Sequence, residues 1–240
     1  MDASADLDKI GMRNVSRFIV FFALFGASLA ATARITPATL GDPEAERYLL
    51  RFIEFPETHG DAEVRLQCVA IIKGSGKMQD AGCFIRNNWD PDFAEAVQKA
   101  SKKAAFAPAM DGKKGKRIAM MFRVEFLKTG DEQTINVFLN PGVEEMLEAY
   151  GQDHISAQRV MGKEAWQKAC PTHARWLVHV RAHVNEEGVA SSVDLVHGGG
   201  IVPTGTCQQA LTETITLSPF APATVGGEPV PSSYEESFGH

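Results

Sequence analysis

The stretch AFAPAMDGKKGKR, residues 105–117, returns in altered form as PFAPATVGGEPVP, residues 219–231. Each copy reads Phe-Ala-Pro-Ala followed by a glycine-containing turn, and Phe106 and Phe220 stand 114 positions apart (220 − 106). That spacing is longer than the period of solenoid repeats and suits a duplicated small domain. The sequence therefore predicts two related domains of about 100 residues each.

The first half has the order strand, strand, helix, strand. Residues 64–73 alternate apolar and polar side chains, and residues 77–86 follow as a second strand after a Gly-Ser-Gly turn. A helix is expected after Asp90, its N-cap, because apolar side chains recur there at helical spacing. Residues 117–126 alternate again, and residues 134–139 are expected to pair back on this strand.

The second half repeats this order. Residues 176–184 and 189–197 are predicted strands, and the glycines at 198–200 are predicted to form a loop. Thr204 or Thr206 caps the next helix, and a weaker last strand covers residues 229–238. The side chains expected to face inward from this helix are Cys207, Ala210, Leu211 and Thr214.

The sequence thus predicts an α+β fold of two small strand-strand-helix-strand domains with antiparallel sheets. Two helices, the first capped by Asn140 and the second within residues 156–170, are expected to join them. The predicted plan is a signal peptide at 1–33, a lead segment at 34–63, a first domain at 64–139, a helical linker at 140–170 and a second domain at 171–240.

The N-terminal residues have the features of an export signal. Arg13 and Arg17 precede residues 18–33, which carry no charge and are fewer than the ~20 residues that span a bilayer as a helix. Small residues at 31–33 suit cleavage after Ala33. We expect an exported, periplasmic protein, with a retained membrane anchor as the alternative.

Export makes the four cysteines candidates for disulfides. The simple pairing is Cys68 with Cys83 and Cys170 with Cys207, but four cysteines allow three connectivities. Four buried thiols are the alternative. The absence of a Cys-x-x-Cys motif argues against a tetrathiolate zinc site.

Phe-Ala-Pro-Ala-x-x-Gly-x-Pro-Val before a strand resembles the C-terminal domain of the TonB energy-transducer family. FAPAMDGKKGKRIAMMFRVEF is similar to that family's segment from the end of the helix to the last strand, and FAPATVGGEPVPSSYEESF to its Gly-x-Pro-Val ending. CPTHAR, residues 170–175, is similar to the family's Tyr-Pro-x-x-Ala-Arg start, with cysteine in place of tyrosine. The first half has no such start. These stretches cover roughly half of the chain.

The resemblance implies an antiparallel sheet with the helix on one face, whose last strand binds an extended segment of an outer-membrane receptor by strand addition. Glu235, Glu236 and the prolines could instead blunt the second edge. The partner-binding residues that it implies are Arg117, Ile118, Met120, Phe122 and Val124 in the first domain, and Val230, Ser232 and Tyr234 in the second.

The expected function is therefore binding of an outer-membrane or other envelope protein. A second hypothesis is a membrane-anchored, TonB-like energy transducer, which requires an uncleaved N-terminal segment. A third is an envelope enzyme of unknown type. The formal charge of −6 argues against a nucleic-acid partner, and the basic run at 113–117 is expected in a solvated turn.

No catalytic residue, metal or cofactor is expected. His179 and His183 would suit a metal on a helix, but on a strand their rings lie roughly 13 Å apart. His-Gly-Gly-Gly at 197–200 is found in the oxyanion loop of some esterases, yet no Gly-x-Ser-x-Gly follows it.

Overall fold

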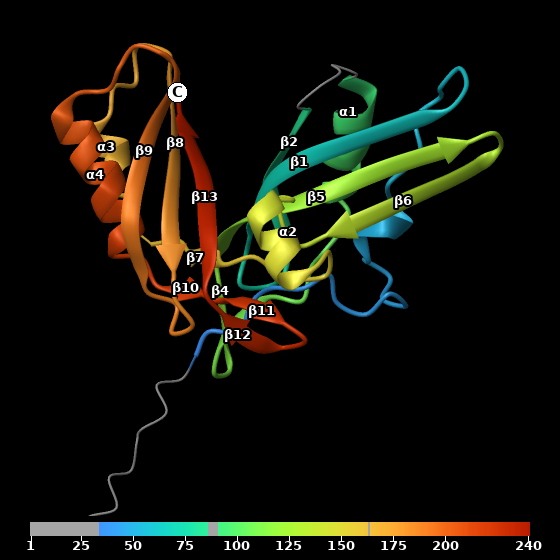
Figure 1. Ribbon diagram of the computed structural model, residues 1–240, viewed down its shortest axis with the longest axis horizontal. Coiled ribbons are helices and arrows are strands. Elements are labelled where there is room, and N and C mark those ends of the chain that lie inside the picture. The colour runs from blue at the N-terminus through green and yellow to red at the C-terminus, as the bar shows by residue number, and fades with distance from the viewer. Residues whose placement is uncertain (1–33, 86–90, 163) are drawn as a thin grey trace, which may run out of the picture. The chain divides into compact units, whose positions relative to one another are not determined.

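The computed structural model describes residues 34–85, 91–162 and 164–240 (Figure 1). The predicted signal peptide and the cap at Asp90 lie outside these residues. The rest is a mixed α+β structure with antiparallel strand pairs, which confirms the predicted class. No helix within the described residues is long and apolar enough to cross a membrane.

The first half follows the predicted order, with a short hairpin inserted before the third strand. The central strand β5 pairs with β1 on one side and with β6 on the other, and β2 lies beyond β1. Its elements are η1 (Leu49–Arg51), β1 (Ala62–Ile72), β2 (Met78–Ile85), α1 (Pro91–Ser101), β3 (Ala109–Asp111), β4 (Lys114–Lys116), β5 (Ile118–Thr129) and β6 (Glu132–Phe138).

The second half has the same strand order, β9-β8-β13, beside a matching hairpin of β11 and β12. Helix α4 covers the buried face of this sheet, as α1 does in the first half (Figure 1). The remaining elements are α2 (Glu144–Tyr150), β7 (Gln158–Val160), α3 (Trp166–Ala169), β8 (Trp176–Val184), β9 (Ala190–Gly200), α4 (Gly205–Thr216), β10 (Phe220–Ala221), β11 (Ala223–Val225), β12 (Glu228–Val230) and β13 (Ser232–Gly239).

The repeated Phe-Ala-Pro-Ala segment has the same role in both halves. Its phenylalanine is buried, and its N–H donates to the carbonyl of the glycine that ends the strand hairpin, Gly76 for Phe106 and Gly188 for Phe220. Both glycines have a positive φ, 82° and 77°. A Cβ on either would overlap the phenylalanine carbonyl oxygen. The sequence repeat therefore marks the point where the returning chain passes against the hairpin turn.

The structural repeat also begins earlier than the sequence suggested. Thr36 and Thr39 bridge Met110 and Ala107 in the first half. Correspondingly, Ile155 bridges Thr224, and β7 pairs with β10. Each copy thus has a short lead strand against its Phe-Ala-Pro-Ala segment. All described residues fall in one compact unit, and the domain boundaries at 64–139 and 171–240 stay a prediction.

Each half has its own apolar core. In the first, Phe55, Phe93 and Phe126 meet edge to face between α1 and the sheet. In the second, the inward side chains of β8 pack on α4, where Leu211 and Ile215 are fully buried. Thr214, which the sequence predicts to face inward, is only half-buried, because Ile215 takes the core position.

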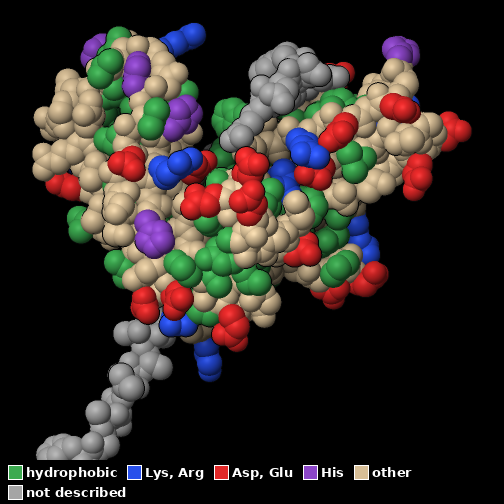
Figure 2. Space-filling view, viewed as in Figure 1, with side chains coloured by type: hydrophobic (Ala, Val, Ile, Leu, Met, Phe, Trp, Pro, Cys, Tyr) green, Lys and Arg blue, Asp and Glu red, His purple; other side chains and the backbone are tan. Residues whose placement is uncertain are grey.

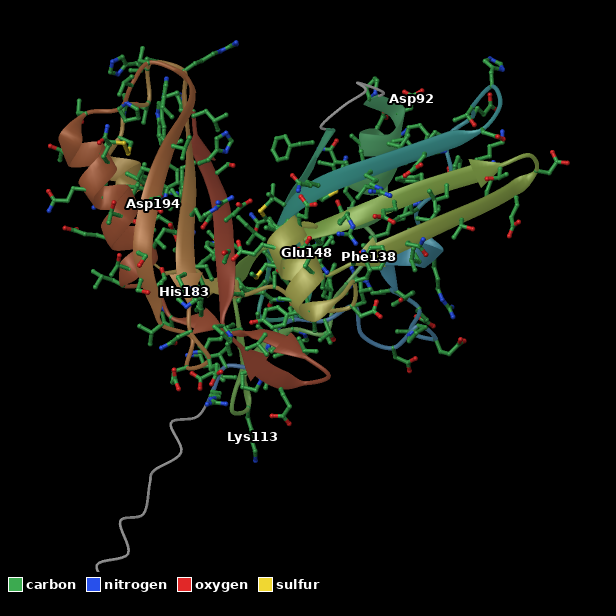
Figure 3. The ribbon with its side chains drawn as sticks, viewed as in Figure 1. Asp92, Lys113, Phe138, Glu148, His183 and Asp194 are labelled. Atoms are coloured by element: carbon green, nitrogen blue, oxygen red, sulfur yellow. A yellow bond between two sulfur atoms is a disulfide. The ribbon has the colours of Figure 1, made fainter. Side chains whose placement is uncertain are left out.

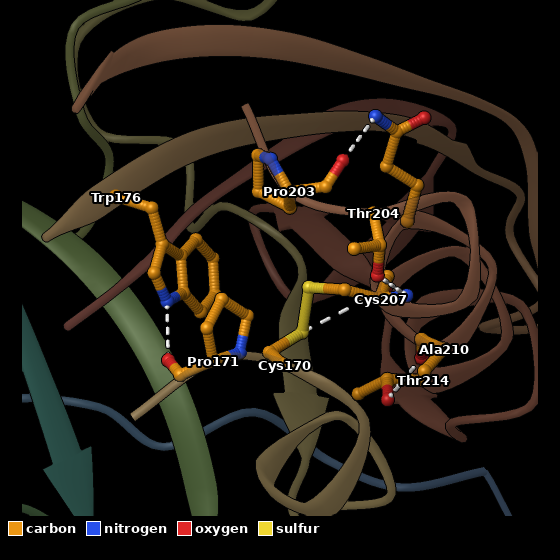
Figure 4. Close-up of a disulfide and its surroundings, with 9 residues drawn as sticks. Cys170, Pro171, Trp176, Pro203, Thr204, Cys207, Ala210 and Thr214 are labelled. Carbon is orange, nitrogen blue, oxygen red and sulfur yellow. Dashed lines mark hydrogen bonds between the residues drawn. A yellow bond between two sulfur atoms is a disulfide. The ribbon is translucent and has the colours of Figure 1, made fainter. Parts of the chain in front are cut away.

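The predicted disulfides are both present and use the simple pairing. Cys68–Cys83 joins directly opposed residues of β1 and β2. Cys170–Cys207 ties the residue after α3 to the first turn of α4, whose N-cap is Thr204 as predicted (Figure 4). Disulfides persist in oxidising compartments, so both bonds fit an exported protein.

Of the two predicted helices between the halves, the first is present as α2 but begins later than expected, and the second is reduced to α3. Asn140 caps no helix: its buried amide donates to the carbonyls of Gln152 and His154, and α2 starts only after Val143. Among the described residues 156–162 and 164–170, only α3 is helical, because β7 forms sheet pairs with β5 and β10. These tertiary pairings override the local helical preference.

The predicted loop at 198–200 is also wrong. Gly199 and Gly200 continue β9 and pair with Leu177 and Trp176. Sheet pairing requires only backbone groups, so a run without side chains can extend a strand.

The contact between Gly76 and the Phe106 carbonyl can be tested by comparing two glycine variants of the first half. Gly76→Ala combines the left-handed strain of about 1–2 kcal/mol with the overlap on Phe106, so we expect a loss of about 3 kcal/mol in the free energy of unfolding. Gly112 has a φ of 58° with no atom within 4 Å of the position that a Cβ would take, so Gly112→Ala isolates the strain and should cost about 1 kcal/mol. Equal losses in urea unfolding would contradict the role assigned to Phe106.

A second prediction concerns His154, which is 2% exposed. Burial lowers the pKa of its imidazole, and Arg123 lowers it further, against a hydrogen bond to the Gly151 carbonyl. The folded protein therefore holds His154 neutral where the unfolded chain binds a proton, below about pH 6.5. The free energy of unfolding should fall on acidification by at most about 1.4 kcal/mol per pH unit from this group.

Urea unfolding between about pH 7.5 and 5.5 tests this effect. His154→Gln should lose that part of the pH dependence, whereas His183→Gln, at an exposed histidine, should retain it. An unchanged pH dependence in the His154 variant would refute the assignment.

Candidate functional site

The first predicted edge is not an edge. β5 pairs with β1 along its whole length, and its other side is taken by β7 near Ile118 and by β6 from Arg123 onward. The side chains predicted to bind a partner there point into the core: Ile118, Met120, Phe122 and Val124 are buried, and Arg117 lies just before the strand. The expectation of an exposed edge at 117–126 is therefore wrong. The pairing with β6 was already predicted from residues 134–139, whereas β7 comes from the predicted linker and was not expected.

The second predicted edge is present. β13 pairs with β8, and no other strand among residues 34–85, 91–162 and 164–240 pairs with its outer side. Trp176 and His240 exchange both backbone hydrogen bonds, which sets the phase of the antiparallel ladder. It follows that alternate residues direct their N–H and C=O groups away from β8. These outward residues are Ser233, Glu235, Ser237 and Gly239.

The partner-binding residues predicted from the sequence do not carry the outward backbone groups of this edge. Ser232 and Tyr234 are buried, and their backbone groups bond to β8, while Val230 lies in β12 and pairs with Ala223. The signal that could have separated the two sets is the alternation of Tyr234 and Phe238 with polar residues. This alternation separates the side chains of the core face from those of the other face, but the register with β8 decides which of the two sets directs its backbone groups outward.

A pocket of about 180 Å³ lies beside this edge, and we call it the β13 pocket. One wall is β13 from Tyr234 to Ser237, and the opposite wall is formed by residues of β1, β2 and β5 in the first sheet. Phe84, on this second wall, is 55% exposed, which is unusual for a phenylalanine on a sheet. The residues of the second wall are Val69, Ala70, Ile71, Phe84, Ala119, Met120 and Met121.

A buried ionic network holds β13 next to this wall. The Arg159 side chain is 1% exposed and donates two hydrogen bonds to Glu236, at 2.6 and 2.8 Å, and two to Glu164, at 3.0 and 3.3 Å. Tyr234 donates to Glu236 at 2.7 Å, and Trp166 donates to Glu164 at 3.0 Å. Since Arg159 belongs to β7, the network fastens the edge strand of the second sheet to a strand of the first.

Charge balance explains how this network tolerates burial. Burial alone lowers the pKa of the Arg159 guanidinium, but the bonds to Glu236 and the carboxylate of Glu164 raise it overall. The pKa of the Tyr234 hydroxyl is raised by burial and by Glu236. Tyr234 therefore stays protonated and donates, and Arg159 stays charged.

The two histidines of β8 lie on its exposed face. His179 and His183 are exposed, and the His179 ring contacts the Ser237 hydroxyl at 2.8 Å. Figures 2 and 3 show histidines on this face, where His183 projects from β8 and Asp194 from β9. In the part of the chain that the structure describes, no three His, Cys, Asp or Glu side chains are grouped as metal ligands.

Comparison with known proteins gives no relative: no protein-family model, no curated protein and no solved structure matches this chain. The site is therefore interpreted from its own geometry.

Two arginines that pair with neighbouring glutamates of β13 provide a matched prediction. Arg159→Ala leaves Glu236 and Glu164 buried without a cation, so we expect a loss of about 3–5 kcal/mol in the free energy of unfolding. Arg181 pairs with Glu235, but its side chain is 60% exposed, so Arg181→Ala should cost less than about 1 kcal/mol. Denaturant titration of both variants checks the difference, and similar losses would contradict the structural role of Arg159.

Proposed function

We propose that this protein binds an extended segment of another protein by strand addition at the outer edge of β13. The observation that carries the proposal is the row of backbone N–H and C=O groups at Ser233, Glu235 and Ser237, which meets no other strand among the described residues. An added strand would satisfy these groups with main-chain hydrogen bonds, which supply affinity with little dependence on sequence.

The β13 pocket would supply the selectivity. Side chains alternate across a strand, so every second side chain of the added segment would face the apolar wall that contains Phe84 and Met121. The pocket volume of about 180 Å³ suits an apolar side chain rather than a whole small molecule, since ligand sites generally exceed about 300 Å³. The expected partner segment is thus extended, with an apolar residue at the position opposite the pocket.

The proposed location is the periplasm, and the proposed partner is an outer-membrane or other envelope protein. The two disulfides support an oxidising compartment. The strand, strand, helix, strand order in both halves, with Phe-Ala-Pro-Ala before each last strand, supports the likeness to TonB C-terminal domains. We propose binding alone as the function, without a catalytic step.

Crosslinking from a single position tests the proposed edge. A photo-crosslinking amino acid placed at Ser237 in the full chain should capture an envelope protein through an extended segment. The same amino acid at Lys113, an exposed residue of the β3–β4 turn, should not. Equal capture from both positions would contradict the proposal.

A proline variant then separates edge pairing from other contacts. The Ser237 N–H points away from β8, so Ser237→Pro removes an outward donor and leaves the β8 ladder intact. We expect binding of the captured partner to fall about tenfold, as for the loss of one hydrogen bond and the steric block of the edge. Ser237→Ala retains the N–H and should bind as the wild type. Undiminished binding by a folded Ser237→Pro protein would overturn the proposal.

A further inference from the structure

A second groove lies between β2 and α1, on the far side of the first sheet from β6. β2 is the last strand in the order β10-β7-β5-β1-β2. At its start, the outer side is already occupied: Lys77 bridges Ala105, and the Phe106 N–H donates to Gly76. Beyond Lys77, no strand of the described chain pairs with this side of β2. The edge is therefore closed at its start, and none of the described strands pairs with the rest of it.

The closed end of this groove forms a pocket of about 330 Å³, a volume within the usual range for ligand sites. The described side chains that line it include two lysines and no carboxylate. Neither lysine takes part in an ion pair within residues 34–85, 91–162 and 164–240. The lining residues are Lys77, Met78, Gln79, Ala81, Gln98, Ser101 and Lys102.

The direction of β2 decides what could occupy the groove. An added antiparallel strand has its C-terminal end beside the N-terminal end of β2, which is where Lys77 lies. It cannot continue past this point, because Ala105 already pairs there. Lys102 follows the last turn of α1 on the opposite wall. Strand pairing along β2 would therefore stop beside Lys77, in the pocket that Lys102 also lines.

The second half shows that the fold does not require these cations. Gly188 corresponds to Gly76, so Val189 takes the place of Lys77, and the Phe220–Phe106 correspondence puts Thr216 in the place of Lys102. Val189 is 56% exposed. The same scaffold thus exists in one chain with and without the two charges. The positive pair is a property of the first half alone.

We propose that the groove between β2 and α1 binds the free C-terminal end of a partner polypeptide. The terminal residues add to β2 as an antiparallel strand, and the terminal carboxylate accepts hydrogen bonds from Lys77 and Lys102. The side-chain amides of Gln79 and Gln98 provide further donors in the pocket, and Met78 also lines it. This site is independent of the β13 edge and does not rest on the function proposed above.

The probe is an array of random-sequence hexapeptides attached through their N-termini, each made once with a free C-terminal carboxylate and once as the amide. We expect the full chain to bind a subset of the free-acid peptides and to lose tenfold or more in affinity for their amides. Lys77→Ala and Lys102→Ala should each weaken binding about tenfold, because each removes a charge-assisted hydrogen bond. Lys113→Ala, at an exposed lysine that extends from the β3–β4 turn, should bind as the wild type (Figure 3).

The possible outcomes separate the proposal from simpler ones. Equal binding of acids and amides, or undiminished binding by the Lys77 and Lys102 variants, would overturn it. Competition by acetate without any preference among peptide sequences would show a plain anion site and would also overturn strand addition. Ser237→Pro serves as the second control, because it alters the β13 edge and should leave this binding unchanged.

Discussion

The buried guanidinium of Arg159 is the interaction on which the candidate edge depends. It neutralises two carboxylates from different parts of the chain, and it lies on a strand that belongs to the first sheet. Without it, Glu236 would be a buried anion in the middle of β13. The position of the edge strand beside Phe84 and Met121 therefore depends on this charge cluster together with the ring contact of Tyr234 and Phe220.

The two halves share a backbone plan and differ in surface chemistry. In both halves, the Phe-Ala-Pro-Ala segment pairs with a short lead strand and donates a hydrogen bond to the glycine of the strand hairpin turn. The two halves differ at the strand that follows Phe-Ala-Pro-Ala. In the first half this strand, β5, pairs with β1, β6 and β7, whereas in the second half β13 pairs with β8 alone among the described strands. The first half instead exposes β2 and places two cations at its start. The two halves thus share a strand order and differ in which edge is left unpaired by the described strands.

Much of the local structure could be predicted from the sequence. In half-buried strands such as β1 and β8, apolar and polar side chains alternate because only one face packs on a core. This two-residue period can be recognised in a short stretch of sequence. The open edge could not be read in this way, since it depends on which distant segment pairs with each strand. Arg159 shows the limit most plainly, because a lone arginine in a helical-looking stretch gives no sign that two glutamates will enclose it. The disulfide pairing followed from proximity along the chain, but the sequence alone left three connectivities open.

The disulfide between β1 and β2 has an informative counterpart. By the registers of both sheets, Cys68 and Cys83 correspond to Val180 and Leu195, which face each other across β8 and β9. At the corresponding position of the second sheet, β8 and β9 are therefore joined by an apolar side-chain pair instead of a disulfide. The cross-link of Cys170 and Cys207 likewise belongs to one half only. Each disulfide is therefore found in one half only, and the same backbone arrangement forms in the other half by packing without a covalent bond at the corresponding position.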